Sequence, residues 1–237
     1  MVRFSLVIFH LFYGFILALY ILYISDKSKK KLIKSWSKKL LKLFKVKLEI
    51  NQNIHRILSE KNYLIVSNHI SWLDIFLINS VYPVPFLSKA DVAKWPLIGK
   101  LTKSADTIYI NRDKNKSLSI ASNLIEKHLK KMNSVYFFPE SVATDGSKLL
   151  PFKSNFFQTA INANVDVLPI VIKYTEQNNL STAPSYAGDI SLMQSMMSLI
   201  RLKNIKAKLS ILPKIPSNVN RKMLAEKTHK KIYEALK

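Results

Sequence analysis

The apolar residues of the chain form one long run near the N-terminus and then a series of short runs separated by polar segments. Residues 4–24 carry no charge. A helix over this stretch would be about 31 Å long, enough to cross the hydrocarbon core of a bilayer. The segment after it does not resemble a signal-peptidase site, so we expect the run to stay attached as a membrane anchor.

The segment that follows, residues 27–47, mixes lysine with apolar residues at helical spacing. Leu32, Trp36, Leu40 and Phe44 fall on one side of such a helix, with lysines around most of the rest. Beside an anchor, this pattern predicts an amphipathic helix at an anionic membrane interface, and the alternative is an ordinary surface helix packed on the domain. Because Arg3 alone flanks the anchor on its other side, the positive-inside rule places residues 26 onward in the cytoplasm.

Short apolar runs then alternate with helical patterns as far as the C-terminus. Strand-like runs lie at residues 46–50, 63–66, 84–89, 107–110, 135–138, 165–172 and 206–212. Helical spacing covers residues 70–80, 91–101, 117–132, 156–162 and 219–236. The alternation predicts an α/β layered domain with a largely parallel or mixed sheet. We divide the chain into an N-terminal membrane segment, residues 1–45, and one domain, residues 46–237.

Composition narrows the classes of function. No cysteine occurs among the 237 residues, which excludes a disulfide framework and thiolate chemistry. The formal net charge of +22 comes almost wholly from lysine and suits anionic lipids, nucleic acid or acidic carriers. A base-composition bias of the genome would enrich lysine in the same way. We expect no nucleic-acid binding, since no binding motif is present and arginine, the preferred reader of bases and phosphates, is scarce.

The candidate chemistry begins where the apolar run at residues 63–66 ends. His69 follows the expected strand, and Asp74 comes five residues later in an apolar, helix-like stretch. The carboxylate can reach back one turn and hold one imidazole nitrogen, which leaves the other nitrogen as a general base. By themselves, a histidine and an aspartate at this spacing are more typical of a buried histidine that only satisfies its hydrogen bonds.

A second motif, Phe138-Pro139-Glu140, ends another apolar run about seventy residues later. Together, Asn-His-x4-Asp and Phe-Pro-Glu resemble the glycerolipid acyltransferase family that acylates lysophosphatidic acid. The resemblance covers roughly residues 45–215. It implies a layered acyltransferase domain with a mixed sheet, preceded by N-terminal membrane helices that in this family embed in one leaflet. The sequence does not choose between that arrangement and a spanning helix.

The resemblance also implies roles for individual residues. His69 is then the base and Asp74 its orienting partner in a direct attack on the acyl donor, without a covalent acyl-enzyme. Arg112, at the end of a strand, matches the arginine that binds the phosphate of the acceptor, and its planar guanidinium suits that ligand. Further acceptor or donor contacts are implied for Pro139, Glu140 and Pro169. The alternative for Glu140 is a cap on a helix or turn.

The third motif departs from the family pattern. The usual Gly-Thr-Arg after Phe-Pro-Glu is replaced by Ser141-Val142-Ala143, so one of two cations expected around a phosphate is missing. Lys148 or Lys153 can replace it as a point charge. Relatives that acylate lyso-ornithine lipids have a more similar continuation. A later stretch, Tyr186 to Asp189, also resembles the family, but we assign it no function.

We therefore predict a membrane-bound O-acyltransferase of phospholipid biosynthesis on the cytoplasmic face of the cytoplasmic membrane. The donor is acyl-CoA or acyl-carrier protein, and the leading acceptor is 1-acylglycerol-3-phosphate, giving phosphatidic acid. No cofactor is required. Metal binding has little support, because the histidines are isolated. The alternatives are acylation of lyso-ornithine lipid or another lysolipid, or a catalytically silent protein that only binds the membrane.

Overall fold

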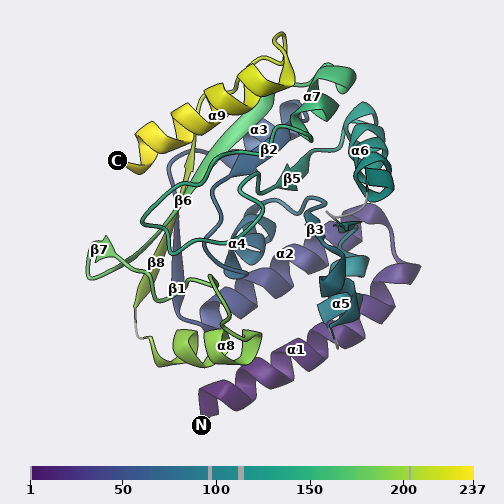
Figure 1. Cartoon of the computed structure of the whole chain (residues 1–237). Helices are drawn as coiled ribbons and strands as arrows, with labels where there is room; N and C mark the ends of the chain where they lie inside the picture. Colours follow the sequence, from purple (N-terminus) through teal and green to yellow (C-terminus); the bar gives the residue numbers. More distant parts are fainter. Residues whose placement is uncertain (1, 96–97, 112–114, 203) are drawn as a thin grey trace.

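The computed structural model describes residues 2–95, 98–111, 115–202 and 204–237. Within this part of the chain, the main sheet has the strand order β1-β8-β6-β2-β5, with β7 paired to the far end of β6 (Figure 1). The strands are β1 (Val46–Ile50), β2 (Leu64–Ser67), β5 (Val135–Phe137), β6 (Val167–Glu176), β7 (Asn179–Leu180) and β8 (Ile205–Ile211). β1 runs parallel to β8, and β2 runs parallel to both β5 and β6. The pairing of β6 with β8 is antiparallel, so the sheet is mixed, as predicted.

Two apolar cores cover the two faces of this sheet. Side chains alternate along the strands, so Ile65 of β2 belongs to one core while its neighbours Leu64 and Val66 belong to the other. The first core is covered by α2 (Asp26–Leu43), α4 (Leu73–Val81) and α8 (Leu192–Arg201), and the second by α6 (Asn115–Lys130), α7 (Phe157–Ala163) and α9 (Arg221–Leu236). The result is the layered α/β domain that the alternating pattern predicted.

The remaining elements are short. They are α3 (Ile54–Glu60), α5 (Ile98–Ser104), two 3₁₀ turns, η1 (Ile21–Tyr23) and η2 (Ala90–Lys94), and the small parallel pair β3 (Leu87–Lys89) and β4 (Ile108–Ile110). The helix predicted over residues 91–101, with a break near Pro96, is confirmed in part, because η2 and the start of α5 lie in this stretch. The sequence pattern missed α3, α8 and β7.

The apolar N-terminal run forms α1 (Val2–Tyr20), which lies along the outside of the domain next to α2, α5 and α8 (Figure 1). Among the described residues, the stretch Val2–Tyr23 is the one helix long and apolar enough to cross a membrane. The expectation of several N-terminal membrane helices is therefore wrong, since there is one apolar helix.

The second N-terminal helix, α2, is part of the domain. Its apolar side chains Trp36, Leu40, Leu41 and Phe44 are buried in the first core, where α2 packs on α4. The apolar face that we expected at a membrane interface is therefore covered by protein, as in the alternative of a packed surface helix. The lysine-rich faces of α2 stay exposed.

Candidate active site

His69 and Asp74 meet at the carboxyl end of β2. The strand ends at Ser67, His69 lies in the connection that follows, and Asp74 occupies the first turn of α4. The distance from Nδ1 of His69 to Oδ2 of Asp74 is 2.9 Å. The structure thus brings together the two residues that the spacing paired.

Asp74 is fully buried and accepts hydrogen bonds at both oxygens. Oδ2 accepts the backbone N–H groups of Ile70 at 2.8 Å and Ser71 at 3.0 Å, and Oδ1 accepts the hydroxyl of Tyr174 at 2.7 Å. Burial, and then the charge of Asp74, raise the pKa of Tyr174 well above its ordinary value, so this hydroxyl stays a donor. A carboxylate held in this way accepts the Nδ1 proton of His69 and leaves Nε2 as the free acceptor.

The imidazole is also fixed by an aromatic neighbour. Phe138 stacks on His69 with ring centroids 3.9 Å apart and an interplanar angle of 15°. The side chain of His69 is 19% exposed, so one edge of the ring reaches the adjoining cavity. Sequence reasoning assigned no role to Phe138 or Tyr174, although Phe138 precedes the Pro139-Glu140 pair of the third motif.

Glu140, in the third motif, accepts hydrogen bonds from the backbone of the loop that carries His69 and from the backbone of the segment after the motif. Its Oε1 accepts the N–H of His69 at 2.7 Å, and its Oε2 accepts the N–H of Leu150 at 2.9 Å. Burial raises the pKa of this carboxyl group, against the lowering effect of the two backbone donors. Glu140 is 4% exposed and is absent from the cavity lining. Its acceptor-binding role stays a prediction, and the observed contacts are those of a group that holds two loops together.

The loop after Glu140 folds back onto His69. Thr144 donates its N–H to the carbonyl oxygen of His69 at 2.9 Å. Ser141 has a φ of 71°, in the left-handed region that favours glycine. The glycine usual at this place in the resembled family therefore has a conformational reason, and Ser141 adopts the same backbone at some steric cost.

A cavity of about 870 Å³ opens beside His69. One part of its wall is apolar and comes from α1, α2 and α5, including Leu17, Trp36 and Leu101. The part near His69 includes Pro139, Ser141 and Lys153. The cavity thus offers an apolar space and a more polar mouth at the imidazole, as an amphiphilic ligand requires.

The other predicted site residues are placed differently. Pro169 is buried within β6, where it faces Val66 in the parallel register, and it does not line the cavity. Its donor-pocket role stays a prediction. Arg112 lies outside the described residues, as the chain is described up to Asn111 and again from residue 115. Ile110, at the end of β4, does line the cavity.

The Tyr186–Asp189 segment, which received no role from sequence, lies at the same site. Tyr186 donates its N–H to the carbonyl oxygen of Ile70 at 2.9 Å, and the hydroxyl of Ser185 donates to the carbonyl oxygen of Thr144 at 3.0 Å. Tyr186 and Asp189 line the cavity. Three loops distant in sequence thus form its mouth.

Comparison with known proteins gives a consistent set of similarities. Residues 45–173, more than half of the chain, match the family described as Acyltransferase. Over 146 residues the chain is 36% identical to a 1-acyl-sn-glycerol-3-phosphate acyltransferase of Neisseria gonorrhoeae, covering 61% of this chain and 57% of that protein. Over 172 residues it is 33% identical to a lyso-ornithine lipid O-acyltransferase of Pseudomonas aeruginosa, covering 72% of this chain and 66% of that protein. The chain thus aligns with less than two thirds of the length of either relative.

A solved structure has the same fold. The crystal structure of the 1-acyl-sn-glycerophosphate (LPA) acyltransferase from Thermotoga maritima superposes with a TM-score of 0.70. The match covers 98% of this chain and 92% of that chain, at 19% sequence identity. At this identity the likeness concerns the fold alone.

Proposed function

Because the chain belongs to the acyltransferase family, we propose that it transfers a fatty acyl group from acyl-CoA or acyl-carrier protein to the free hydroxyl of a lysolipid. The observation that carries the proposal is the His69–Asp74 pair, with Nδ1 held by a buried carboxylate 2.9 Å away, at the mouth of a largely apolar cavity. This arrangement gives a base of fixed orientation next to a space suited to an acyl chain.

The reaction follows from the free nitrogen of His69. Nε2 takes the proton of the acceptor hydroxyl while its oxygen attacks the thioester carbonyl carbon. The tetrahedral intermediate collapses with cleavage of the C–S bond, and the thiolate leaves and takes up the proton from the imidazolium. Asp74 orients the ring and stabilises its positive charge. No nucleophilic thiol takes part, in keeping with a sequence that has no cysteine.

We propose 1-acylglycerol-3-phosphate as the acceptor, with phosphatidic acid as the product. The relative from Neisseria gonorrhoeae supports this choice, as does Lys153 in the cavity wall, whose ammonium group can pair with a phosphate. Arg112 stays the predicted second phosphate ligand. Lyso-ornithine lipid is the other acceptor to consider, because Ser141 and Ala143 replace family residues in the cavity wall and a relative of comparable identity carries that name.

We further propose that α1 associates with the cytoplasmic leaflet without crossing the bilayer. The guanidinium of Arg3 donates to the carbonyl oxygens of Leu43, Ile200 and Leu202, at the carboxyl ends of α2 and α8. These bonds hold the start of α1 against the domain. The exposed face of α1 carries large apolar side chains such as Phe9, Phe12 and Ile16, which suit the leaflet boundary.

The test is an acyl-transfer assay on membranes that contain the wild type or His69→Ala. Lysophosphatidic acid and lyso-ornithine lipid are offered side by side, and the products are identified by mass. Loss of a general base lowers the rate by about a hundredfold to ten-thousandfold. We expect phosphatidic acid from the wild type, a loss of that size in the variant, and equal amounts of both proteins in the membrane fraction.

Other results would change the proposal in defined ways. Full activity of His69→Ala would remove the general-base assignment. A product from the ornithine lipid alone would move the acceptor to that lipid class. If neither lipid is acylated with either donor, the proposal for these two acceptors fails, which leaves another lysolipid as the acceptor or a protein that only binds the membrane.

A further inference from the structure

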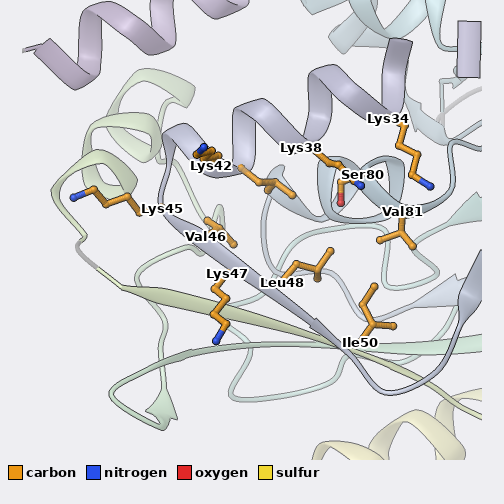
Figure 2. A pocket seen from close by; sticks show the side chains of 11 residues that line it. Lys34, Lys38, Lys42, Lys45, Val46, Lys47, Leu48, Ile50, Ser80 and Val81 are labelled. Atoms are coloured by element: carbon orange, nitrogen blue, oxygen red, sulfur yellow. The ribbon is translucent and has the colours of Figure 1, made fainter. Parts of the chain in front are cut away.

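A second concave site lies away from the catalytic cavity, on the opposite flank of α2. This groove, about 720 Å³ in volume, lies between α2 and β1 (Figure 2). Its lining among the described residues is Lys34, Lys38, Leu41, Lys42, Lys45, Val46, Lys47, Leu48, Ile50, Ser80 and Val81. We call it the lysine groove. α2 separates the two sites, because Ile33 and Trp36 on its other flank line the catalytic cavity.

Of the residues that the structure describes, five lysines line the lysine groove, and Lys47 among them lies 4.0 Å from the carboxylate of Glu49. Lys34, Lys38 and Lys42 follow one another at intervals of four residues, so their side chains form one row along α2 (Figure 2). Among the described residues, no acidic group lies within 4.0 Å of these three ammonium groups. Burial and the charge of Lys38 lower the pKa of Lys34, as expected where like charges crowd together. A bound anion would relieve this repulsion.

The floor of the lysine groove is apolar. Leu48 and Ile50 of β1 and Val81 at the end of α4 lie below the lysine row (Figure 2). Ile50 is 36% exposed, and in the described part of the chain β1 is an edge strand of the sheet with no further strand beside it. Lysines above an apolar floor match a ligand with an anionic head and an apolar tail.

We propose that the lysine groove binds an anionic phospholipid of the bilayer, with the phosphate at Lys34, Lys38 and Lys42 and part of an acyl chain over Leu48 and Ile50. The apolar floor favours a lipid over a soluble anion, because Leu48 and the exposed Ile50 offer an acyl chain a surface that a soluble anion would leave uncovered. α1 packs on the flank of α2 opposite the groove, and in our proposal its exposed apolar face holds the protein at the membrane, where such a lipid is present. The groove goes beyond the proposed acyl transfer, because no residue of the catalytic pair lines it.

The first experiment measures binding of the full chain to phosphatidylcholine vesicles with and without phosphatidylglycerol. The test variant is Lys34→Gln/Lys38→Gln/Lys42→Gln. The matched control is Lys222→Gln/Lys227→Gln/Lys230→Gln, which removes the same charge from exposed positions on α9, at the opposite side of the molecule from α1 (Figure 1). Each lysine near an anionic membrane contributes about fivefold in affinity, so the test variant should bind the anionic vesicles about a hundredfold more weakly than the wild type. The control should lose little, and all proteins should bind neutral vesicles alike through α1.

The outcomes distinguish a specific lipid-binding site from general electrostatic attraction to the membrane. Equal losses in the two triple variants would overturn the groove and leave general electrostatic adsorption. Wild-type binding by the groove variant would overturn it as well. Both outcomes concern lipid binding and not acyl transfer, so the test stays valid even if the protein has no acyltransferase activity.

The second experiment identifies the occupant by amine labelling and mass spectrometry. A short-chain phosphatidylglycerol below its micelle concentration should protect Lys34, Lys38 and Lys42, while glycerol phosphate at the same concentration should not. Ile50→Gln, which changes the exposed floor, should weaken the protection by the lipid. Equal protection by glycerol phosphate would assign the groove to soluble phosphates. Protection by an acidic carrier protein but not by lipid would assign it to a protein partner, and either result overturns the proposal.

Discussion

At the scale of single residues, the site depends on one buried carboxylate with four hydrogen-bond donors. Asp74 accepts from His69, Ile70, Ser71 and Tyr174. The two backbone donors fix the carboxylate to its own turn, while Tyr174 arrives from β6, a hundred residues away in the sequence. The orientation of the proposed base therefore depends on a long-range contact as well as on local spacing.

Tyr174→Phe tests this dependence. The change leaves Oδ1 of Asp74 without its donor in a fully buried site, which should cost about 1–3 kcal/mol of stability. Acyl transfer should fall by about tenfold, less than for His69→Ala, because the backbone donors still hold the carboxylate. The loss should fall on kcat with KM nearly unchanged, because Tyr174 contacts Asp74 and does not line the cavity. A loss of stability with unchanged kcat would make Tyr174 a purely structural residue.

Glu140→Gln tests the carboxyl group that joins two loops. Glutamine offers one acceptor oxygen to two backbone N–H groups, so the free energy of unfolding at neutral pH should fall by about 1–3 kcal/mol. Because burial raises the pKa of Glu140, the folded state takes up the proton at a higher pH than the unfolded chain does. Protonation therefore stabilises the wild type as pH falls through the raised pKa, and this contribution is lost as pH rises through it.

The measurement is denaturant unfolding of both proteins across the acidic range. The difference in stability between wild type and Glu140→Gln should increase as the pH is lowered towards the ordinary pKa of a glutamate. A difference that does not change with pH would show that this carboxyl group has the same pKa in the folded and unfolded chain.

At the scale of elements, the contact between α1 and α2 shapes the apolar part of the cavity. His10 and Trp36 stack with centroids 5.0 Å apart, and each donates a ring N–H to the carbonyl oxygen of the other. Gly14 permits this approach, because a Cβ atom there would lie 2.6 Å from the indole of Trp36. On the α1 side, these contacts come from a helix that the sequence alone identifies only as apolar.

Gly14→Val should separate the two helices. The added side chain meets a ring fixed by hydrogen bonds, so we expect a loss of about 1–3 kcal/mol in stability and a changed tryptophan fluorescence. Val2→Leu is the control, since it adds bulk at a position that is 77% exposed. Equal stability of Gly14→Val and the wild type in detergent would mean that α1 does not pack on α2 in this way.

At the scale of the whole molecule, the two cores, the sheet and the N-terminal helices form one continuous body. α2 supplies buried side chains to the larger core, so residues 1–45 are joined to the domain by packing as well as by the chain. The start of α1 is bonded to the ends of α2 and α8 through Arg3. A helix held at its start in this way and packed on α2 and α5 lies along the domain.

The membrane topology provides the corresponding test. The sequence has no cysteine, so single cysteines can be introduced without background. Val2→Cys and Lys222→Cys should both react with an impermeant maleimide on the same side of sealed, oriented vesicles, because α1 does not cross the bilayer in our proposal. Reaction of the two positions from opposite sides would instead establish a spanning helix.

The sequence by itself determined the local features. Alternating apolar runs specified most strands and helices and a layered α/β domain, because side-chain periodicity reflects which face is buried. They left a largely parallel and a mixed sheet both open. The spacing of His69 and Asp74 specified their contact, since one helical turn connects them. Composition and the apolar run at residues 4–24 indicated one N-terminal helix suited to a membrane. The sequence pattern did not reveal α3 and β7, because seven and two residues are too few for a clear period, whereas α8 has ten residues and an amphipathic pattern that was not recognised.

Only the tertiary structure decided how distant segments meet. Phe138 reaches His69, and Tyr174 reaches Asp74, because β5 and β6 run parallel to β2, a register that no local pattern encodes. The Tyr186 loop reaches Ile70 through a backbone hydrogen bond between segments distant in sequence. The apolar face of α2 entered the core rather than a membrane, because periodicity identifies a buried face without identifying what buries it. For the same reason the lysine row of α2 became one wall of a groove only once β1 was folded beneath it.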